Sequence, residues 1–296
     1  DLPRPAESRH IVGWNPAEPA DDTLLVGRVI TADSGRALAT LVNYACHPTT
    51  LAAENRLLSP DFPGAMRELV ETATGAPCLF LQGASGDLGP AAQHGSDPAV
   101  ADRLGRRLGH AVLATLESWP DALHEVDEVV ESGAPLGIAH PRPPAGSSVL
   151  RATQSSVDFP LKPHEAIADS EAALHACTDR ALRERLWRQR AVRRIVGDGT
   201  ISAQPLWLWR LGEAAIVAHP NEAYSPLQIE LRRLLAPHPV AVLNVTNGYA
   251  GYLPPRDHYT RNQYSVWVTP FAAGSLEQLI ASARDGLRAL FPEKTS

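Results

Sequence analysis

The sequence predicts an α/β fold in which a mixed, partly parallel β-sheet is flanked by helices, with a functional site at the loops that end the strands. Short apolar runs alternate along the chain with segments in which apolar residues recur at helical spacing. Polar or glycine-rich loops follow several of these runs, and ligands of such sheets bind beyond the carboxyl ends of the strands. Because neither an internal repeat nor a clean boundary interrupts the pattern, we expect a single domain over 1–296.

Two helices are expected in the first part of the chain. Residues 62–75 suit a helix that ends at Gly75, because glycine readily adopts the left-handed conformation that closes a helix. A second helix is expected to begin at Asp97-Pro98, with the aspartate as N-cap and the proline at the first helical position. Three apolar runs are expected to form strands, over 23–30, 37–45 and 78–82.

The middle of the chain is less regular. Residues 133–150 are rich in proline, glycine and serine and are expected to form a loop, followed by a short edge strand over 155–161. Residues 163–196 suit a long helix or a pair of helices. We therefore interpret 133–200 as a loop and helical insertion.

The α/β pattern resumes in the last third. Residues 205–212 and 214–218 are expected to form a hairpin through a turn at Gly212-Glu213. The remaining expected elements are a helix that opens within 219–236, a strand that starts at 240 and ends at an Asn-Gly turn, and an amphipathic helix over 275–290 with Ser275 as N-cap.

Composition excludes several classes of function. Of the 296 residues, 44% are hydrophobic, which is enough for a sizeable core. The net charge of −6 argues against nucleic acid as the main partner, because binding phosphates needs a basic surplus. No run approaches the roughly eighteen apolar residues of a membrane-spanning helix. The three cysteines, Cys46, Cys78 and Cys177, form neither a disulfide framework nor a CxxC metal site, and those in apolar runs are expected to be buried thiols.

Positive charge is concentrated in residues 179–196, which are rich in arginine. The simplest interpretation is a solvated face of a helix. A specific role at an anion or at a membrane surface is the alternative.

Four polar loops, over 46–61, 83–95, 219–224 and 247–264, follow apolar strands and carry the candidate chemistry. A hydrolytic metal site needs imidazole and carboxylate ligands with one coordination position open for water. Because the chain has no HExxH, HxH or CxxC, a purely structural role stays open for each histidine. The candidates in these loops are His47, Asp61, Asp87, His94, His219, Glu222, Tyr249, Tyr252, His258, Tyr259 and Tyr264.

The glycine-rich loop Gly83-Ala84-Ser85-Gly86-Asp87 admits three interpretations. A serine-hydrolase elbow reads G-x-S-x-G, and here the second glycine comes one residue early. A phosphate-binding loop needs a lysine that this segment lacks. The third interpretation is a tight strand-to-helix loop whose backbone either approaches a substrate or simply closes the turn.

Four segments in this order resemble the neutral/alkaline, non-lysosomal ceramidase family: "NYACHPT", "GASGDLGP", "NEAYS" and "NGYAGYLPPRDHY…QYSVW". The resemblance covers about residues 23 to 290 and is weakest over 120–200. Members of this family are zinc amidases that cleave the N-acyl bond of ceramide. The resemblance therefore implies a zinc-dependent hydrolase that acts on a small-molecule or lipid-like amide.

Matched motif by motif, the resemblance also implies roles for individual residues. His47, Glu222 and Tyr252 correspond to zinc ligands of the family, and Tyr264 to a tyrosine near the reacting centre. Asp87 is expected to take part in catalysis. Asp61, Gly86 and Asn247 are expected in the second shell or the substrate loop, and Asp61 and Asp87 could orient His47, as metal-bound histidines require.

The chain also departs from the family pattern. The family's other zinc histidine lies upstream of the position that Asp1 matches, so we expect an N-terminally incomplete catalytic domain. Gly89 stands where the family carries a reactive serine. The chain has no room for the family's C-terminal β-sandwich, which favours a soluble amide or ester substrate over ceramide.

Two other functions stay open. The chain is either a non-catalytic member that binds a lipid or small ligand through the same pocket, or an α/β domain whose strand-end polar residues only cap loops. The pattern leaves the compartment, the oligomeric state and the substrate undetermined.

Overall fold

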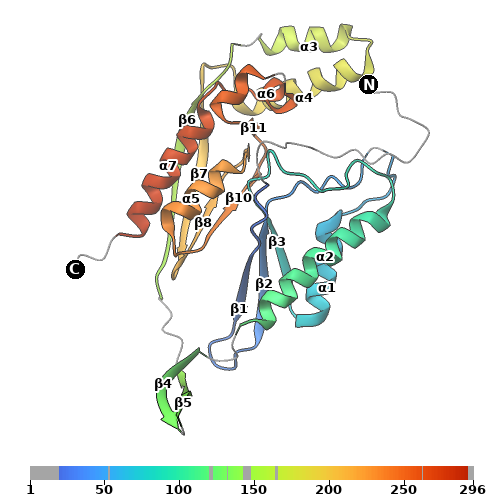
Figure 1. The fold of residues 1–296 in the computed structure, drawn as a ribbon. Helices are drawn as coiled ribbons and strands as arrows, with labels where there is room; N and C mark the ends of the chain where they lie inside the picture. The colour runs from blue at the N-terminus through green and yellow to red at the C-terminus, as the bar shows by residue number, and fades with distance from the viewer. Residues whose placement is uncertain are drawn as a thin grey trace.

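The computed structural model describes residues 20–52, 54–119, 123–131, 133–142, 148–163, 166–261 and 263–292. Within these ranges the chain is a mixed α/β fold with two main sheets, each flanked by helices (Figure 1). The expected fold class is confirmed.

The first sheet has the order β1-β2-β3. Strand β1 (Leu25–Ile30) pairs antiparallel with β2 (Ala37–Tyr44), and β2 pairs parallel with β3 (Cys78–Gln82). Helices α1 (Phe62–Thr74) and α2 (Pro98–Glu117) pack on this sheet. Their small shared core consists of Val42, Met66, Val70, Cys78 and Val112.

Local sequence explains why α1 and α2 begin and end where they do. The Asp97 carboxylate accepts a hydrogen bond from the Ala99 amide as the N-cap of α2. Gly75 has a left-handed φ of 66° and ends α1, as predicted. Gly105 allows the two helices to touch, because a Cβ there would lie 2.3 Å from the Phe62 carbonyl oxygen.

The second sheet has the order β10-β8-β7-β6 and carries the larger core. Strands β6 (Leu150–Pro160), β7 (Ile201–Leu211) and β8 (Ala214–Ala218) are antiparallel neighbours, and β10 (Val240–Leu243) pairs parallel with β8. Helices α5 (Pro226–Leu235) and α7 (Ser275–Leu290) pack against this sheet (Figure 1). The hairpin turn at Gly212-Glu213 is confirmed.

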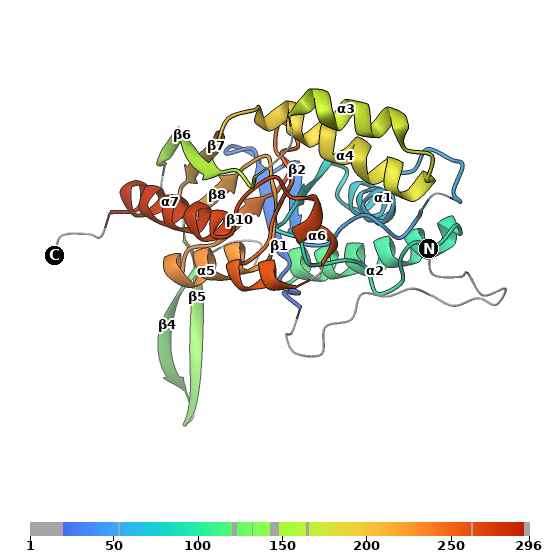
Figure 2. The ribbon, with the colours of Figure 1, turned by 90° about the horizontal axis from the view of Figure 1, so that it is seen from above.

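Smaller elements gather at one end of the second sheet. Helices α3 (Ile167–Ala176) and α4 (Arg180–Val196) form the predicted pair, and α6 (Tyr264–Val268) lies against α4 (Figures 1 and 2). Strand β9 (Glu222–Ala223), β11 (Tyr252–Leu253) and the 3-10 turn η1 (Arg256–Thr260) complete this end. Among the helices in the described part of the chain, none has the length and apolar character needed to cross a membrane.

Two expectations for local structure were wrong. Residues 134–142 are not a loop, because Ala134–Arg142 is strand β5, paired antiparallel with β4 (Leu123–Glu131). The prolines that suggested a loop lie in a two-stranded ribbon, where a missing amide donor is tolerated because each strand has a free edge. Ser275 is not the N-cap of α7 but its first residue; Gly274 precedes it, and the Ser275 hydroxyl donates to the Ala272 carbonyl.

The two sheets meet along a seam between β3 and β10. The buried Asn43 amide donates to the carbonyl oxygens of Leu81 and Val242, at 2.9 Å each, and so links three strands from both sheets. At the carboxyl ends of the strands, the Asn244 amide N–H donates to the Gln82 carbonyl at 2.9 Å. The seam therefore brings the ends of β2, β3, β8 and β10 to one place.

Candidate metal centre

The candidate site lies at this shared strand end. His47 follows β2, the glycine-rich loop follows β3, Glu222 follows β8, and Tyr252 follows β10. The four loops are distant in sequence, and parallel pairing of β2 with β3 and of β8 with β10 directs them to one edge. The structure thus brings His47, Glu222 and Tyr252 together.

His47 is held from both sides of its imidazole ring. Its Nδ1 lies 3.0 Å from the carbonyl oxygen of Leu88, and its Nε2 lies 3.0 Å from Oε2 of Glu222. Burial lowers the pKa of His47, but the hydrogen bond and negative charge of Glu222 more than offset burial, so its pKa is raised overall. A proton on Nδ1 shared with Leu88 leaves Nε2 available to a metal ion.

The main chain sets the position of Glu222 beside Tyr252. Strands β9 and β11 are parallel, and their register pairs Glu222 directly with Tyr252. The Glu222 amide donates to the Gly251 carbonyl at 3.0 Å. Gly251 has a φ of 96°, a conformation that glycine adopts without strain, so the chain can turn into β11 at this point.

Aromatic rings extend the site from His47 toward solvent. The Tyr252 ring stacks on His47 with centroids 6.3 Å apart, and the Tyr264 ring meets Tyr252 edge-on at 6.1 Å. Burial, followed by the charge of Glu222, raises the pKa values of Tyr252 and Tyr249 well above the ordinary phenol value. Tyr264 is 47% exposed, and its hydroxyl accepts a hydrogen bond from Nη1 of Arg188 at 3.3 Å.

The glycine-rich loop supports the site through its backbone. The Gly86 amide donates to the Ala223 carbonyl, and a Cβ at Gly86 would lie 2.8 Å from the Glu222 carbonyl oxygen, so only glycine allows this approach. The two carboxylate oxygens of Asp87 accept hydrogen bonds from the Ser225 amide and hydroxyl, at 2.7 Å each. Ser85 is buried, and its hydroxyl accepts a hydrogen bond from the Gln82 side-chain amide; among the described residues no hydrogen bond joins this hydroxyl to a histidine, which disfavours the serine-hydrolase interpretation.

Asp61 and Asp87, which were expected to orient His47, instead accept hydrogen bonds at the starts of helices. Asp61 is the N-cap of α1, and its carboxylate accepts from the amides of Phe62 and Leu51. Asp87 is likewise held at the start of α5 by Ser225. The expectation that these carboxylates orient His47 is therefore wrong, because the partner of its Nδ1 is the Leu88 carbonyl.

The other candidates occupy structural positions or the surface. His219 is fully buried, which lowers its pKa to about 3, and its Nδ1 accepts from the Asn221 amide. His258 is buried edge-on against Tyr224, 5.6 Å between ring centroids. Asn247 lies exposed in the turn after β10, with a φ of 56°.

Two contributors to the site were not predicted from sequence. The Leu88 carbonyl acts through the main chain, which leaves no side-chain signal. Arg188 comes from a helix in the segment that was interpreted as an insertion. Tyr249, which was among the candidates, hydrogen bonds with Glu222.

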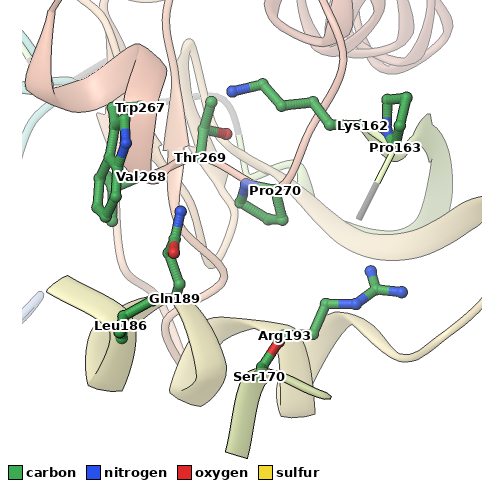
Figure 3. Close-up of a pocket in the computed structure, with 10 residues that line it drawn as sticks. All are labelled: Lys162, Pro163, Ser170, Leu186, Gln189, Arg193, Trp267, Val268, Thr269 and Pro270. Atoms are coloured by element: carbon green, nitrogen blue, oxygen red, sulfur yellow. The ribbon is translucent and has the colours of Figure 1, made fainter. Parts of the chain in front are cut away.

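Two hollows are lined by residues that adjoin residues of the site in sequence or contact them. One, of about 490 Å³, is lined by Cys46 and Gly89, which flank the contact between His47 and Leu88, and by apolar side chains that include Leu104 and Leu108. The second, of about 400 Å³, lies between α4 and the end of α6 (Figure 3). There Gln189 points toward Thr269, whose hydroxyl donates to the Tyr252 carbonyl, while the Arg193 guanidinium turns toward Pro163 (Figure 3).

The donors fit a zinc ion. Imidazole nitrogen, carboxylate oxygen and phenol oxygen are ligands that zinc accepts, and three protein ligands with one open position are typical of catalytic zinc. Two ligands of one tetrahedral zinc lie roughly 3.4 Å apart, close to the 3.0 Å between Nε2 of His47 and Oε2 of Glu222. Within the described ranges no three residues of the His, Cys, Asp and Glu types cluster as a metal site.

Comparison with known proteins supports the fold. A solved ceramidase complexed with C2 superposes with a TM-score of 0.60 at 16% identity, covering 95% of this chain and 51% of that one. The neutral ceramidase from Pseudomonas aeruginosa gives a TM-score of 0.55 at 17% identity, covering 92% and 47%. No protein-family model and no curated protein matches the chain. The chain thus has a ceramidase-like fold and spans about half the length of these ceramidases.

Proposed function

We propose that this chain provides the metal centre of a zinc-dependent hydrolase that cleaves the N-acyl amide bond of a lipid-like substrate. The observation that carries the proposal is the pair formed by His47 and Glu222. These residues follow strands of different sheets, β2 and β8, and their donor atoms lie 3.0 Å apart beside Tyr252. Bound zinc supplies Lewis acidity, which polarises a carbonyl oxygen and activates water.

Each residue of the proposed centre would have a distinct role. Leu88 fixes the imidazole of His47 so that Nε2 stays free for the metal, and Glu222 supplies negative charge. Tyr252 completes the donor set. Tyr264, whose hydroxyl is exposed at the mouth of the site, is suited to donate a hydrogen bond to an oxygen of the substrate that gains charge. Asp87 acts as a positioning residue, because it ties the glycine-rich loop to the helix after Glu222.

Two features support a lipid-like amide as the substrate. The hollow of about 490 Å³ beside Cys46 and Gly89 is lined largely by apolar side chains and has room for part of an alkyl chain. The two similar solved proteins are described as ceramidases. Gly89 stands where the ceramidase family carries a reactive serine and offers no hydroxyl. The substrate therefore need not be ceramide itself.

The first test is the zinc content of the purified chain and of the variant His47→Ala. We expect about one zinc per chain in the parent and a fall of more than about 100-fold in zinc affinity in the variant, because a ligand is lost. His110→Ala is the matched control, since His110 is exposed on α2. Equal zinc binding by all three proteins would overturn the proposed centre.

The second candidate function is binding without catalysis, which the absence of a side chain at Gly89 favours. Activity on N-acyl substrates, with and without a chelator, separates the two. Chelator-sensitive release of a fatty acid supports the hydrolase. Saturable binding of the substrate without turnover, in a protein that holds zinc, supports the binder.

A further inference from the structure

Helix α4 has a strongly cationic surface in an acidic protein. Its 17 residues include seven arginines and one glutamate, whereas the whole chain has a net charge of −6. A short helix with this much like charge is unfavourable unless its charges meet anions. Among the described residues, only Arg188 of these arginines contacts the proposed centre.

Much of this charge is not neutralised within the protein. Within the described ranges, Arg180, Arg183 and Arg185 form no ion pair, whereas Arg188 pairs with Glu184 and Arg194 with Glu171. Arg180 and Arg183 are both exposed. These two side chains are free to meet an external anion.

Apolar side chains lie among these arginines. Arg180, Arg183 and Trp187 follow the spacing i, i+3, i+7 and share one side of the helix, which we term the α4 face. Trp187 is 53% exposed and Leu182, nearby on the helix, is 46% exposed. A hollow of about 420 Å³ between α3 and α4 is lined by Arg180, Arg183 and Trp187.

The cationic helix is joined to the mouth of the candidate centre. The Arg185 guanidinium lies 5.5 Å from the ring centroid of Trp267 on α6, and Arg188 donates to the Tyr264 hydroxyl. Trp267 is itself 36% exposed. Figures 1 and 2 show α3, α4 and α6 grouped at the same end of the molecule.

We propose that the α4 face docks on an anionic lipid surface. Arginines meet lipid phosphates and other anionic headgroups, while tryptophan enters the interface between water and acyl chains. The exposed Trp187 among arginines favours a lipid surface over nucleic acid, for which charge alone would suffice. Docking holds the molecule at the lipid; its use for substrate capture rests on the proposed function, but the docking itself does not.

The test measures co-sedimentation of the full chain with two kinds of vesicle. One is phosphatidylcholine alone, and the other contains phosphatidylglycerol as roughly a third of the lipid. We expect binding to the anionic vesicles to be at least about tenfold tighter, and to weaken as salt rises from about 0.1 M to 0.5 M. The double variant R180Q/R183Q should lose on the order of 25-fold in affinity for the anionic vesicles, since each arginine contributes about fivefold.

Controls isolate the α4 face from general charge and from folding. R103Q/R106Q removes two exposed arginines from α2 and should bind anionic vesicles as the parent does. Trp187→Ala should weaken binding to both vesicle types, because it removes apolar area rather than charge. Circular dichroism and thermal unfolding check that each variant keeps the fold.

Three outcomes would overturn the proposal. They are equal binding of anionic and neutral vesicles, an equal loss in the α2 and α4 variants, or double-stranded DNA binding as tightly as the anionic vesicles with the same loss in R180Q/R183Q. His47→Ala should dock like the parent, since its change lies at the metal centre. Absence of zinc from the parent chain with docking intact would count against the proposed function alone, and zinc binding by a parent chain that does not dock would count against docking alone.

Discussion

The two sheets of this molecule contribute unequal cores but complementary parts of one site. The β1-β2-β3 sheet packs a small core with α1 and α2, and it supplies His47 and the glycine-rich loop. The β10-β8-β7-β6 sheet carries a much larger core, and the segments that follow β8 and β10 supply Glu222, Tyr252 and Tyr264. Neither half holds a donor set by itself.

This difference shows where the site is vulnerable. The half with the larger core presents its donors on a main-chain ladder, whereas the other half presents His47 on a loop that Leu88 steadies. The proposed zinc binding would therefore depend on the seam that sets the two halves side by side. Four substitutions test this difference between the halves.

Tyr264→Phe tests whether the half with the larger core also contributes to the proposed hydrolysis, in addition to supplying metal ligands. We expect kcat on an N-acyl substrate to fall about 100-fold, because a hydrogen-bond donor to the developing charge is lost. Zinc content should not change, since Tyr264 is not among the donors. Tyr259→Phe is the matched control, because the Tyr259 hydroxyl donates to the Phe271 carbonyl inside the structure. A parallel loss of zinc in Tyr264→Phe would contradict this division of roles.

Asn43→Ala breaks the seam. It leaves the buried carbonyl oxygens of Leu81 and Val242 without this donor, so the free energy of unfolding should fall by about 2 kcal/mol. Zinc affinity should fall as well, because His47 and Glu222 come from opposite sides of the seam. Chemical denaturation and zinc titration measure the two effects.

Asn55→Ala controls for the loss of an asparagine amide. The Asn55 amide donates to the Leu57 carbonyl in an exposed loop, so its removal should cost within about 0.5 kcal/mol. If Asn43→Ala lowered stability but left zinc affinity intact, the seam would not set the spacing of the donors.

Asp87→Asn weakens the link between the glycine-rich loop and α5. It removes a negative charge at the start of a helix and one of two hydrogen bonds to Ser225, so we expect a loss of about 1 kcal/mol in thermal unfolding. Asp33→Asn is the control, because Asp33 accepts a hydrogen bond from Ser34 in an exposed turn. A larger fall in kcat than in stability would instead indicate a catalytic role for Asp87.

Gly89→Ser should have the smallest effect on stability, within about 0.5 kcal/mol. A side chain at this position would meet Oε1 of Gln93 at 2.9 Å, which is the far end of a flexible side chain and able to move. The informative measurement is the rate of N-acyl hydrolysis before and after the change. A gain in rate would mean that the missing hydroxyl limits the parent, and no change would mean that the residues at the seam suffice.

Much of the fold could be predicted from local sequence patterns. Strand Cys78–Gln82 and helix Ser275–Leu290 have the predicted bounds. The short apolar run of the first favours a buried strand, and the apolar residues at helical spacing in the second favour an amphipathic helix. The predicted helix at 62–75 ends at Gly75 as expected. Strand β5 was missed because its prolines resemble a loop until its partner strand is known.

The candidate site was predictable only in part. The motifs indicated His47, Glu222 and Tyr252, and the structure brings them together, although their roles as ligands remain a prediction. The partner of His47 was missed, because a main-chain carbonyl such as that of Leu88 can belong to any residue type. Asp61 and Asp87 were assigned to His47 on residue type, whereas nearby helix starts provide them with closer amide donors.

The two-residue ladder between β9 and β11 has a consequence for altering the chemistry of the centre. Because backbone pairing fixes the neighbourhood of Glu222 and Tyr252, the identity of either side chain can change without moving the position from which it projects. Tyr252→His would exchange a phenol for an imidazole and produce the two-histidine, one-carboxylate donor set that several metal ions share. The ladder would thus let the donor set of the proposed centre be changed at one position, while the backbone that carries it stays in place.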